Sequence, residues 1–163
     1  MKINLDDVTL VVVDCLNPEL AKNAILQSQK FCEFNKSLLF TDIKSDNLNF
    51  DVIQIDRIGS IKEYSEFIFK KLNSYIVTKF IIIAQWDGYV VNSKTWTNDF
   101  RKYDYIGAKW HWHKDGKNIG NGGFSFRSKK LLELTSSDEF PFLENEPEDE
   151  QICITYREYL VSK

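Results

Sequence analysis

Short apolar runs rich in β-branched residues are the feature that most constrains the fold of this 163-residue chain. Val8–Val13 reads VTLVVV and Lys79–Ala84 reads KFIIIA, and both resemble strands that are buried on both faces. Two further runs, Ser37–Thr41 and Val52–Ile55, also read as strands. The chain is therefore expected to build a sheet that is covered on both sides.

Helical patterns separate these strands. Asn17 and Pro18 supply an N-cap and a first-turn proline, and helical spacing continues as far as Phe31. Ser60 and Glu63 form a capping box before a second amphipathic helix. The inward positions of that helix are Ile61, Tyr64, Ile68 and Leu72. Strands that alternate with helices predict βαβ units, so the expected fold class is α/β with a mainly parallel central sheet flanked by helices.

The second half of the chain is predicted to complete the same domain. The expected elements are a short helix over Ser93–Arg101, a strand over Asp104–Ala108, a polar aromatic loop over Trp110–Asn118, a strand over Gly123–Arg127, a helix capped by Ser128 that runs through Leu134, and a final helix from about Glu148 to Leu160. No repeat, low-complexity tract or linker divides the sequence. We therefore expect one domain over residues 1–163.

Composition excludes several classes of protein. An apolar content of 43% and an aromatic content of 14% predict a packed globule rather than a disordered chain. The net charge of −3 comes without a basic patch, so nucleic acid is not an expected partner. No apolar run is long enough for a membrane span or a secretory signal. Three widely spaced cysteines form neither a disulfide framework nor a metal-ligand pair, which favours a reducing, cytoplasmic location.

Acidic residues fall at or just past the carboxyl ends of the predicted strands. They are Asp14, Asp42, Asp56 and Asp87. Ligands of open α/β sheets bind beyond these strand ends, although loops are rich in aspartate for other reasons.

Asp87 directly follows a buried strand and precedes a glycine. A carboxylate held there suits a divalent cation, Mg²⁺ or Mn²⁺, that bridges a diphosphate, because such cations prefer oxygen ligands. The alternative is an ordinary turn residue in an Asp-Gly dipeptide.

Glu148, Asp149 and Glu150 open the last predicted helix. One of them could act as a general base that deprotonates a hydroxyl, because the first turn of a packed helix fixes the position of a side chain. The alternative is a structural one, since acids at a helix N-terminus complement the helix dipole.

The run Gly120–Gly123 lies just before a predicted strand. It lacks the register of a dinucleotide fingerprint, and no P-loop lysine follows. A tight turn whose N–H groups face a ligand fits better, and a purely structural turn is the alternative. Trp110 could stack on a sugar or cover the sheet edge. His111 and His113 could be half a metal site, line an acceptor pocket or be exposed.

Four motifs occur in a fixed order along most of the chain. They are Phe80–Gly88 (FIIIAQWDG), Tyr103–Trp110 (YDYIGAKW), Gly120–Ser128 (GNGGFSFRS) and Pro147–Glu150 (PEDE). From about Ile53 to Tyr156 the chain resembles an uncharacterised bacterial and viral family that looks like GT-A glycosyltransferases, which are single α/β domains that bind a nucleotide-sugar.

The resemblance implies roles for particular residues. Gln85-Trp86-Asp87 would correspond to the D-x-D motif that holds the metal and the diphosphate, with glutamine in place of the first acid. The glycine-rich strand would form one wall of the site that binds the donor sugar and the acceptor. Glu148-Asp149 would be the acidic pair that often supplies the base. The family usually continues past the last helix, so we expect a short or truncated member that lacks a C-terminal metal or phosphate ligand.

The predicted function is transfer of a sugar from a nucleotide-sugar to a hydroxyl acceptor in surface-glycan assembly, with a divalent cation as cofactor. The predicted catalytic residues are Asp149 and, second, Glu148. The predicted donor-binding residues are Asp87 (also the metal ligand), Gln85, Trp86, Gly88, Asp14 and Asp42. The predicted sugar- or acceptor-binding residues are Asn121, Gly122, Gly123, Ser125, Trp110 and His111.

Two alternatives belong to other classes. A non-catalytic nucleotide-sugar or glycan-binding module would keep the fold and lose the chemistry, as Gln85 and the short C-terminus allow. A phosphatase of the haloacid dehalogenase type would use Asp14, but its chemistry needs a second aspartate where Leu16 stands.

Overall fold

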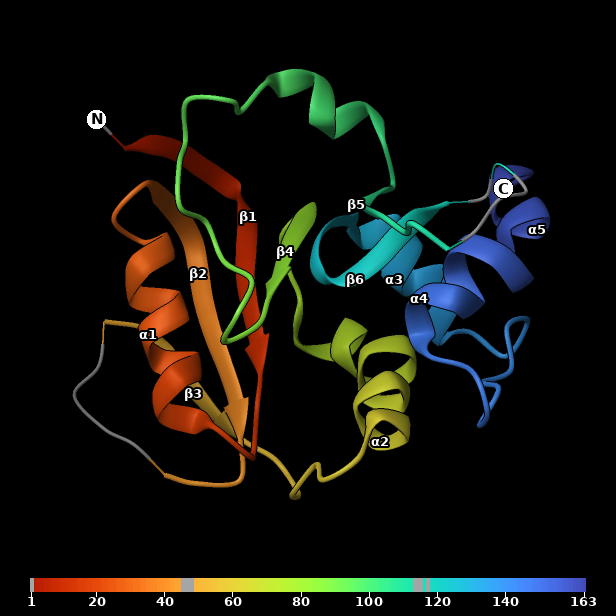
Figure 1. Ribbon diagram of the computed structural model, residues 1–163, viewed down its shortest axis with the longest axis horizontal. Coiled ribbons are helices and arrows are strands. Elements are labelled where there is room, and N and C mark those ends of the chain that lie inside the picture. Colours follow the sequence, from red (N-terminus) through yellow and green to blue (C-terminus); the bar gives the residue numbers. More distant parts are fainter. Residues whose placement is uncertain (1, 45–48, 113–115, 117) are drawn as a thin grey trace.

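The computed structural model describes residues 2–44, 49–112, 116 and 118–163. A six-stranded sheet in the order β3-β2-β1-β4-β6-β5 runs through the molecule, with helices on both sides (Figure 1). The strands are β1 (Ile3–Val13), β2 (Cys32–Thr41), β3 (Asp51–Gln54), β4 (Phe80–Ala84), β5 (Tyr105–Lys109) and β6 (Ile119–Ser128). The helices are α1 (Pro18–Ser28), α2 (Ile61–Glu66), η1 (Phe67–Lys71), η2 (Leu72–Tyr75), η3 (Asn98–Lys102), α3 (Lys129–Ser136), α4 (Glu148–Glu150), η4 (Gln151–Thr155) and α5 (Arg157–Val161).

The sheet is mixed, and its parallel part carries the predicted strands. β1 is parallel to both β2 and β4, and β2 is parallel to β3. β6 is antiparallel to both of its neighbours, β4 and β5. The α/β class is therefore confirmed. The carboxyl ends of β1 and β4 lie side by side, because Val12 pairs with Ala84.

Several of the predicted boundaries are wrong by a few residues. β1 begins at Ile3, although the apolar run begins only at Val8. α1 ends at Ser28 rather than Phe31, and β2 begins at Cys32. Ser28 is buried: its hydroxyl donates to the Ala24 carbonyl and accepts the N–H of Val90. The first residues of β2 are mostly polar and show no apolar alternation, so the sequence does not indicate where this strand begins.

Alternate residues of β1 face different apolar clusters. Leu10 and Val12 pack with Ala21 and Ile25 of α1 on one side of the sheet. On the other side, Val11 and Val13 pack with the α2–η1–η2 segment and with α3; the buried partners there include Ile68, Leu72, Ile76 and Leu132. This alternation explains why the strand reads as a continuous apolar run.

The second helical segment departs from the predicted regular helix. Ser60 caps it by accepting the N–H of Glu63 at 3.2 Å, as the capping box predicts. The turn widens at η1, which is a π-helical turn. Ile68 and Leu72 are buried as expected, but Ile61 is 74% exposed, so its inward placement is wrong. The residue stands at the first helical position, on the rim of a cleft.

The C-terminal segments form a third cluster beside the sheet. Phe69, Trp110, Leu131, Phe140 and Ile152 are its main buried members. The last predicted helix is broken into α4, η4 and α5, and the helix predicted over Ser93–Arg101 is reduced to η3. The described part of the chain contains no helix that is both long and apolar enough to cross a membrane. Packing of this cluster places α4 against β6, which positions the acidic residues of α4.

Candidate functional site

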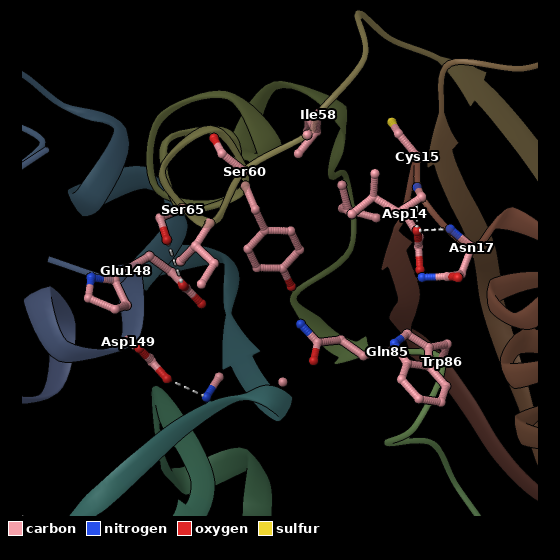
Figure 2. Close-up of a pocket in the computed structure, with 18 of the residues that line it drawn as sticks. Asp14, Cys15, Asn17, Ile58, Ser60, Ser65, Gln85, Trp86, Glu148 and Asp149 are labelled. Carbon is pink, nitrogen blue, oxygen red and sulfur yellow. Dashed lines mark hydrogen bonds between the residues drawn. The ribbon is translucent and has the colours of Figure 1, made fainter. Parts of the chain in front are cut away.

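A cleft of about 540 Å³ lies at the carboxyl ends of β1 and β4, between them and the segments α2 and α4 (Figure 2). This is the edge of the sheet at which open α/β sheets bind ligands. Its lining comes from residues 13–17, 58–61, 64–65, 85–86, 121–123 and 147–149.

The structure brings part of the predicted site together. The predicted residues that line the cleft are Asp14, Gln85, Trp86, Asn121, Gly122, Gly123, Glu148 and Asp149. Those that do not line it are Asp42, Asp87, Gly88, Ser125, Trp110 and His111. His113 lies outside the described residues. Segments far apart in the sequence thus meet in one cleft, and the carboxylates of Asp14 and Asp149 stand on opposite sides of it (Figure 2).

Asp149 is held by a glycine of β6. Its Oδ2 accepts the backbone N–H of Gly122 at 2.8 Å (Figure 2). Its Oδ1 accepts the N–H of Glu150 at 2.9 Å. A carboxylate with both oxygens fixed has one orientation, and each oxygen keeps a further lone pair. Asp149 is therefore a preorganised hydrogen-bond acceptor that faces the cleft.

Glu148 differs from its neighbour, because an internal cation neutralises it. Its Oε1 pairs with Nη2 of Arg127 at 2.8 Å, and the two side chains are 5% and 0% exposed. The Ser65 hydroxyl donates to its Oε2 over 3.4 Å. Burial raises the pKa of the Glu148 carboxyl, while the Arg127 charge acts in the opposite direction. The ion pair thus occupies Glu148 and leaves Asp149 as the carboxylate that is open to the cleft.

Arg127 is fixed by two contacts in addition to Glu148. Its Nε donates to Ser125 Oγ at 3.0 Å, and its guanidinium carbon lies 4.9 Å from the centre of the Tyr105 ring. The Ser125 hydroxyl in turn donates to the Gly122 carbonyl at 3.0 Å. Ser125 therefore supports the site from behind and does not face the cleft.

Gly120–Gly123 lie within β6, which begins at Ile119, so the predicted tight turn and the predicted strand start at Gly123 are wrong. The glycines of this strand make room for side chains of the protein itself. A Cβ on Gly122 would lie 2.5 Å from Glu148 Oε1 and 2.8 Å from Arg127 Nη2. A Cβ on Gly123 would lie 2.7 Å from Gln85 Oε1. At Gly120 it would meet Trp110 and Cys153 within 3 Å. The glycine run is thus required by the packing of the site, whatever ligand the cleft takes.

The Gln85–Gly88 motif is a tight turn at the end of β4. Gln85 and Gly88 exchange two backbone hydrogen bonds, of 2.9 and 3.1 Å. Trp86 and Asp87 form the exposed tip of this turn, and the Gln85 side chain enters the cleft. No group of three or more His, Cys, Asp or Glu side chains suited to a metal ion occurs among the described residues. Asp87 brings one carboxylate, so this donor set does not fit a divalent cation held by protein ligands alone.

Asp14 and Asp42 have local structural partners. Asp14 Oδ1 accepts the N–H groups of Leu16 and Asn17 at 2.8 and 2.6 Å, which fixes the turn from β1 into α1. The carboxylate nevertheless lines the cleft. Asp42 pairs with Arg57 at 2.9 Å beyond β2, outside the cleft.

Tyr64 is a site residue that the sequence analysis assigned to the core. Its ring packs against the apolar cluster below α2, but the residue also lines the cleft. Its hydroxyl oxygen is buried and makes no hydrogen bond of normal geometry, although the Gln85 side chain lies close to it. Burial raises the pKa of this hydroxyl, so Tyr64 is a neutral donor and acceptor at the base of the cleft. In the sequence, Tyr64 stands four residues after the helix cap, and this position does not indicate its second role in the cleft.

One family comparison bears on the chain as a whole. Residues 47–159 match the model of a protein family of unknown function, DUF5672. The chain belongs to this family. No curated protein matches the sequence.

The DUF5672 match covers most of the cleft. It contains the segments that carry Tyr64, Gln85, Gly122 and Asp149. The turn with Asp14 at the end of β1 precedes the matched region. Most of the lining is therefore part of the family domain, to which the N-terminal residues add one wall.

Proposed function

We propose that this DUF5672 protein is a glycosyltransferase of the GT-A type, which transfers a sugar from a nucleotide-sugar to a hydroxyl acceptor in surface-glycan assembly. The proposal places the reaction in the cleft at the carboxyl ends of β1 and β4. It also places the protein in the cytoplasm, where its three buried free cysteines would stay reduced.

One observation carries the proposal: Asp149 is fixed by Gly122 at the cleft wall, while its neighbour Glu148 is neutralised by Arg127. A general base must be ionised, oriented and open to the substrate. Asp149 meets the last two conditions by its geometry. A carboxylate that can accept a proton from a hydroxyl is what the transfer chemistry needs at the acceptor.

The transfer step follows from this arrangement. The acceptor hydroxyl donates its hydrogen bond to Asp149, and the hydroxyl oxygen attacks the anomeric carbon of the donor sugar. The bond from that carbon to the diphosphate oxygen breaks, and its electron pair leaves with the nucleoside diphosphate. The proton of the hydroxyl passes to Asp149. Gly122 keeps the carboxylate aimed at the acceptor throughout, which limits the reorganisation that the step requires.

The diphosphate brings negative charge to a cleft whose described lining contains no Lys, Arg or His. We therefore propose that a divalent cation, Mn²⁺ or Mg²⁺, enters the cleft already bound to the diphosphate and is not a resident ion of the protein. Such a cation would offset the charge of the leaving group. We propose that the carboxylate of Asp87, at the tip of the Gln85–Gly88 turn, approaches this cation.

A non-catalytic nucleotide-sugar or glycan-binding module is the second candidate. The observation in its favour is Gln85, which enters the cleft at the position where the D-x-D resemblance would place an acid. An amide can bind a hydroxyl or a phosphate oxygen, but it has no negative charge to hold a cation. This candidate predicts binding without turnover.

A thermal-shift panel tests the proposal. Nucleoside diphosphates and nucleotide-sugars are added to the protein, each with and without Mn²⁺, and the melting temperature is followed. A ligand that binds the folded state raises the melting temperature by mass action. We expect a shift for at least one nucleotide-sugar in the presence of Mn²⁺. If no nucleotide changes the melting temperature under either condition, both candidates lose their support.

A further inference from the structure

The charge of the cleft restricts its occupants. Its described lining includes the carboxylates of Asp14 and Asp149 and lacks any cationic side chain. Arg127 lies behind this wall, but it is fully buried and paired with Glu148. The carboxylates that face the cleft are thus not offset by a side chain of the lining.

Apart from Glu148, whose charge is offset by Arg127, the remaining polar lining is neutral. It consists mainly of amide and hydroxyl groups, from Asn17, Ser60, Tyr64, Gln85 and Asn121. These groups can both donate and accept hydrogen bonds, which suits the hydroxyls of a sugar. The Trp86 ring, 48% exposed at the tip of its turn, offers a flat apolar face at the rim. Polyhydroxylated rings combine such polar edges with apolar faces.

We infer that the acceptor taken by this cleft is a neutral or amine-bearing sugar, and that the cleft discriminates against acidic sugars. The inference rests on the proposed function only in taking the occupant to be a sugar. An ammonium group would be attracted by Asp14 and Asp149, whereas a carboxylate would be repelled by both. Like charges within a few ångströms of each other at a protein surface are expected to weaken binding at least about tenfold.

Three matched methyl glycosides test this discrimination. Methyl glucoside is neutral, methyl glucosaminide carries an ammonium group, and methyl glucuronide carries a carboxylate. Their dissociation constants are measured by ligand-observed NMR titration at mildly acidic pH, where both charged groups are ionised, and the galactose series is run in parallel. We expect methyl glucuronide to bind at least about tenfold more weakly than methyl glucoside, and methyl glucosaminide to bind at least as tightly.

Charge-removing variants show whether the cleft is responsible. Asp149→Asn and Asp14→Asn each remove one carboxylate, and each should reduce the ratio between neutral and acidic sugars. Glu33→Gln is the matched control: it changes the net charge equally, but Glu33 is exposed at the start of β2, at the opposite end of the strands from the cleft. That variant should keep the wild-type ratio.

The possible outcomes separate this inference from the proposed function. Equal affinity for methyl glucuronide and methyl glucoside overturns the inference, even if sugar transfer is observed. A ratio that changes equally in Glu33→Gln and Asp149→Asn also overturns it, because the effect would then come from net charge. No binding by any of the six sugars overturns it as well. Discrimination without nucleotide binding would support the inference and count against the transferase.

Discussion

The backbone N–H of Gly122 donates to Asp149 Oδ2 at 2.8 Å and so joins β6 to the first turn of α4. The side chains of Glu148 and Arg127 pack against Gly122 in the space that a Cβ atom would need. A single backbone position therefore orients the exposed carboxylate and accommodates the buried ion pair. The functional claim depends on this contact, and so does part of the stability.

Gly122→Ala tests the packing half of that relationship. The new methyl group would stand 2.5 Å from Glu148 Oε1, so the buried pair or the strand must shift. We expect a loss of roughly 1–3 kcal/mol in the free energy of unfolding, measured by urea denaturation. Gly59→Ala is the control, because a Cβ there meets only Glu63 Oε2, at 3.8 Å. Equal stability of the two variants would contradict the packing described here.

Arg127→Met tests the buried ion pair. The substitution leaves Glu148 buried without its cation, which should cost about 3–5 kcal/mol of unfolding free energy. The double variant Arg127→Met with Glu148→Gln should recover part of that loss, because no uncompensated charge remains. If the double variant were no more stable than Arg127→Met, the loss would come from the missing side-chain volume and not from the charge.

The same variant predicts a pH dependence. Burial already raises the pKa of Glu148, and loss of Arg127 removes an effect that lowers it. A carboxyl whose pKa is higher in the folded state contributes stability below its unfolded pKa and loses this contribution as pH rises through the folded value. The destabilisation of Arg127→Met should therefore be smallest at acidic pH and grow towards neutral pH. A loss that is independent of pH would indicate that Arg127 does not influence the protonation of Glu148 in the folded protein.

The buried cysteines should be inert in the folded protein. Burial raises the pKa of Cys32 to about 11 and, as the main effect, that of Cys153 to about 12, so neither is a thiolate at neutral pH. We expect both to react with a thiol reagent at mildly alkaline pH only after denaturant is added, as followed by mass spectrometry. Rapid modification of Cys153 in the native state would contradict the packing of η4 against Gly120.

Local patterns in the sequence were sufficient for the central strands and for two helix caps. The runs around Val11 and Ile82 predict buried strands, because residues covered on both faces are continuously apolar. Ser60 and Ser128 cap their helices as predicted. The polar start of β2 and the breaks in the last helix were missed, because tertiary packing rather than local pattern decides them.

From the sequence, only the site residues that belong to recognisable motifs could be predicted. Gln85, Gly122 and Asp149 come from separate motifs, and the structure places them in one cleft. The pairing of Glu148 with Arg127 joins residues 21 positions apart, and no local signal marks it. The role of Tyr64 was hidden for a related reason, since an inward helical position reads as core whether or not its hydroxyl reaches a cavity.

The most direct test of the central claim is release of nucleoside diphosphate in the presence of an acceptor, compared among wild type, Asp149→Asn and Glu150→Gln. The account predicts release by wild type and by Glu150→Gln, whose altered side chain does not line the cleft. It predicts a rate about 10²–10⁴-fold lower for Asp149→Asn, with nucleotide binding retained. A wild-type rate in Asp149→Asn would contradict the assignment of Asp149 as the base.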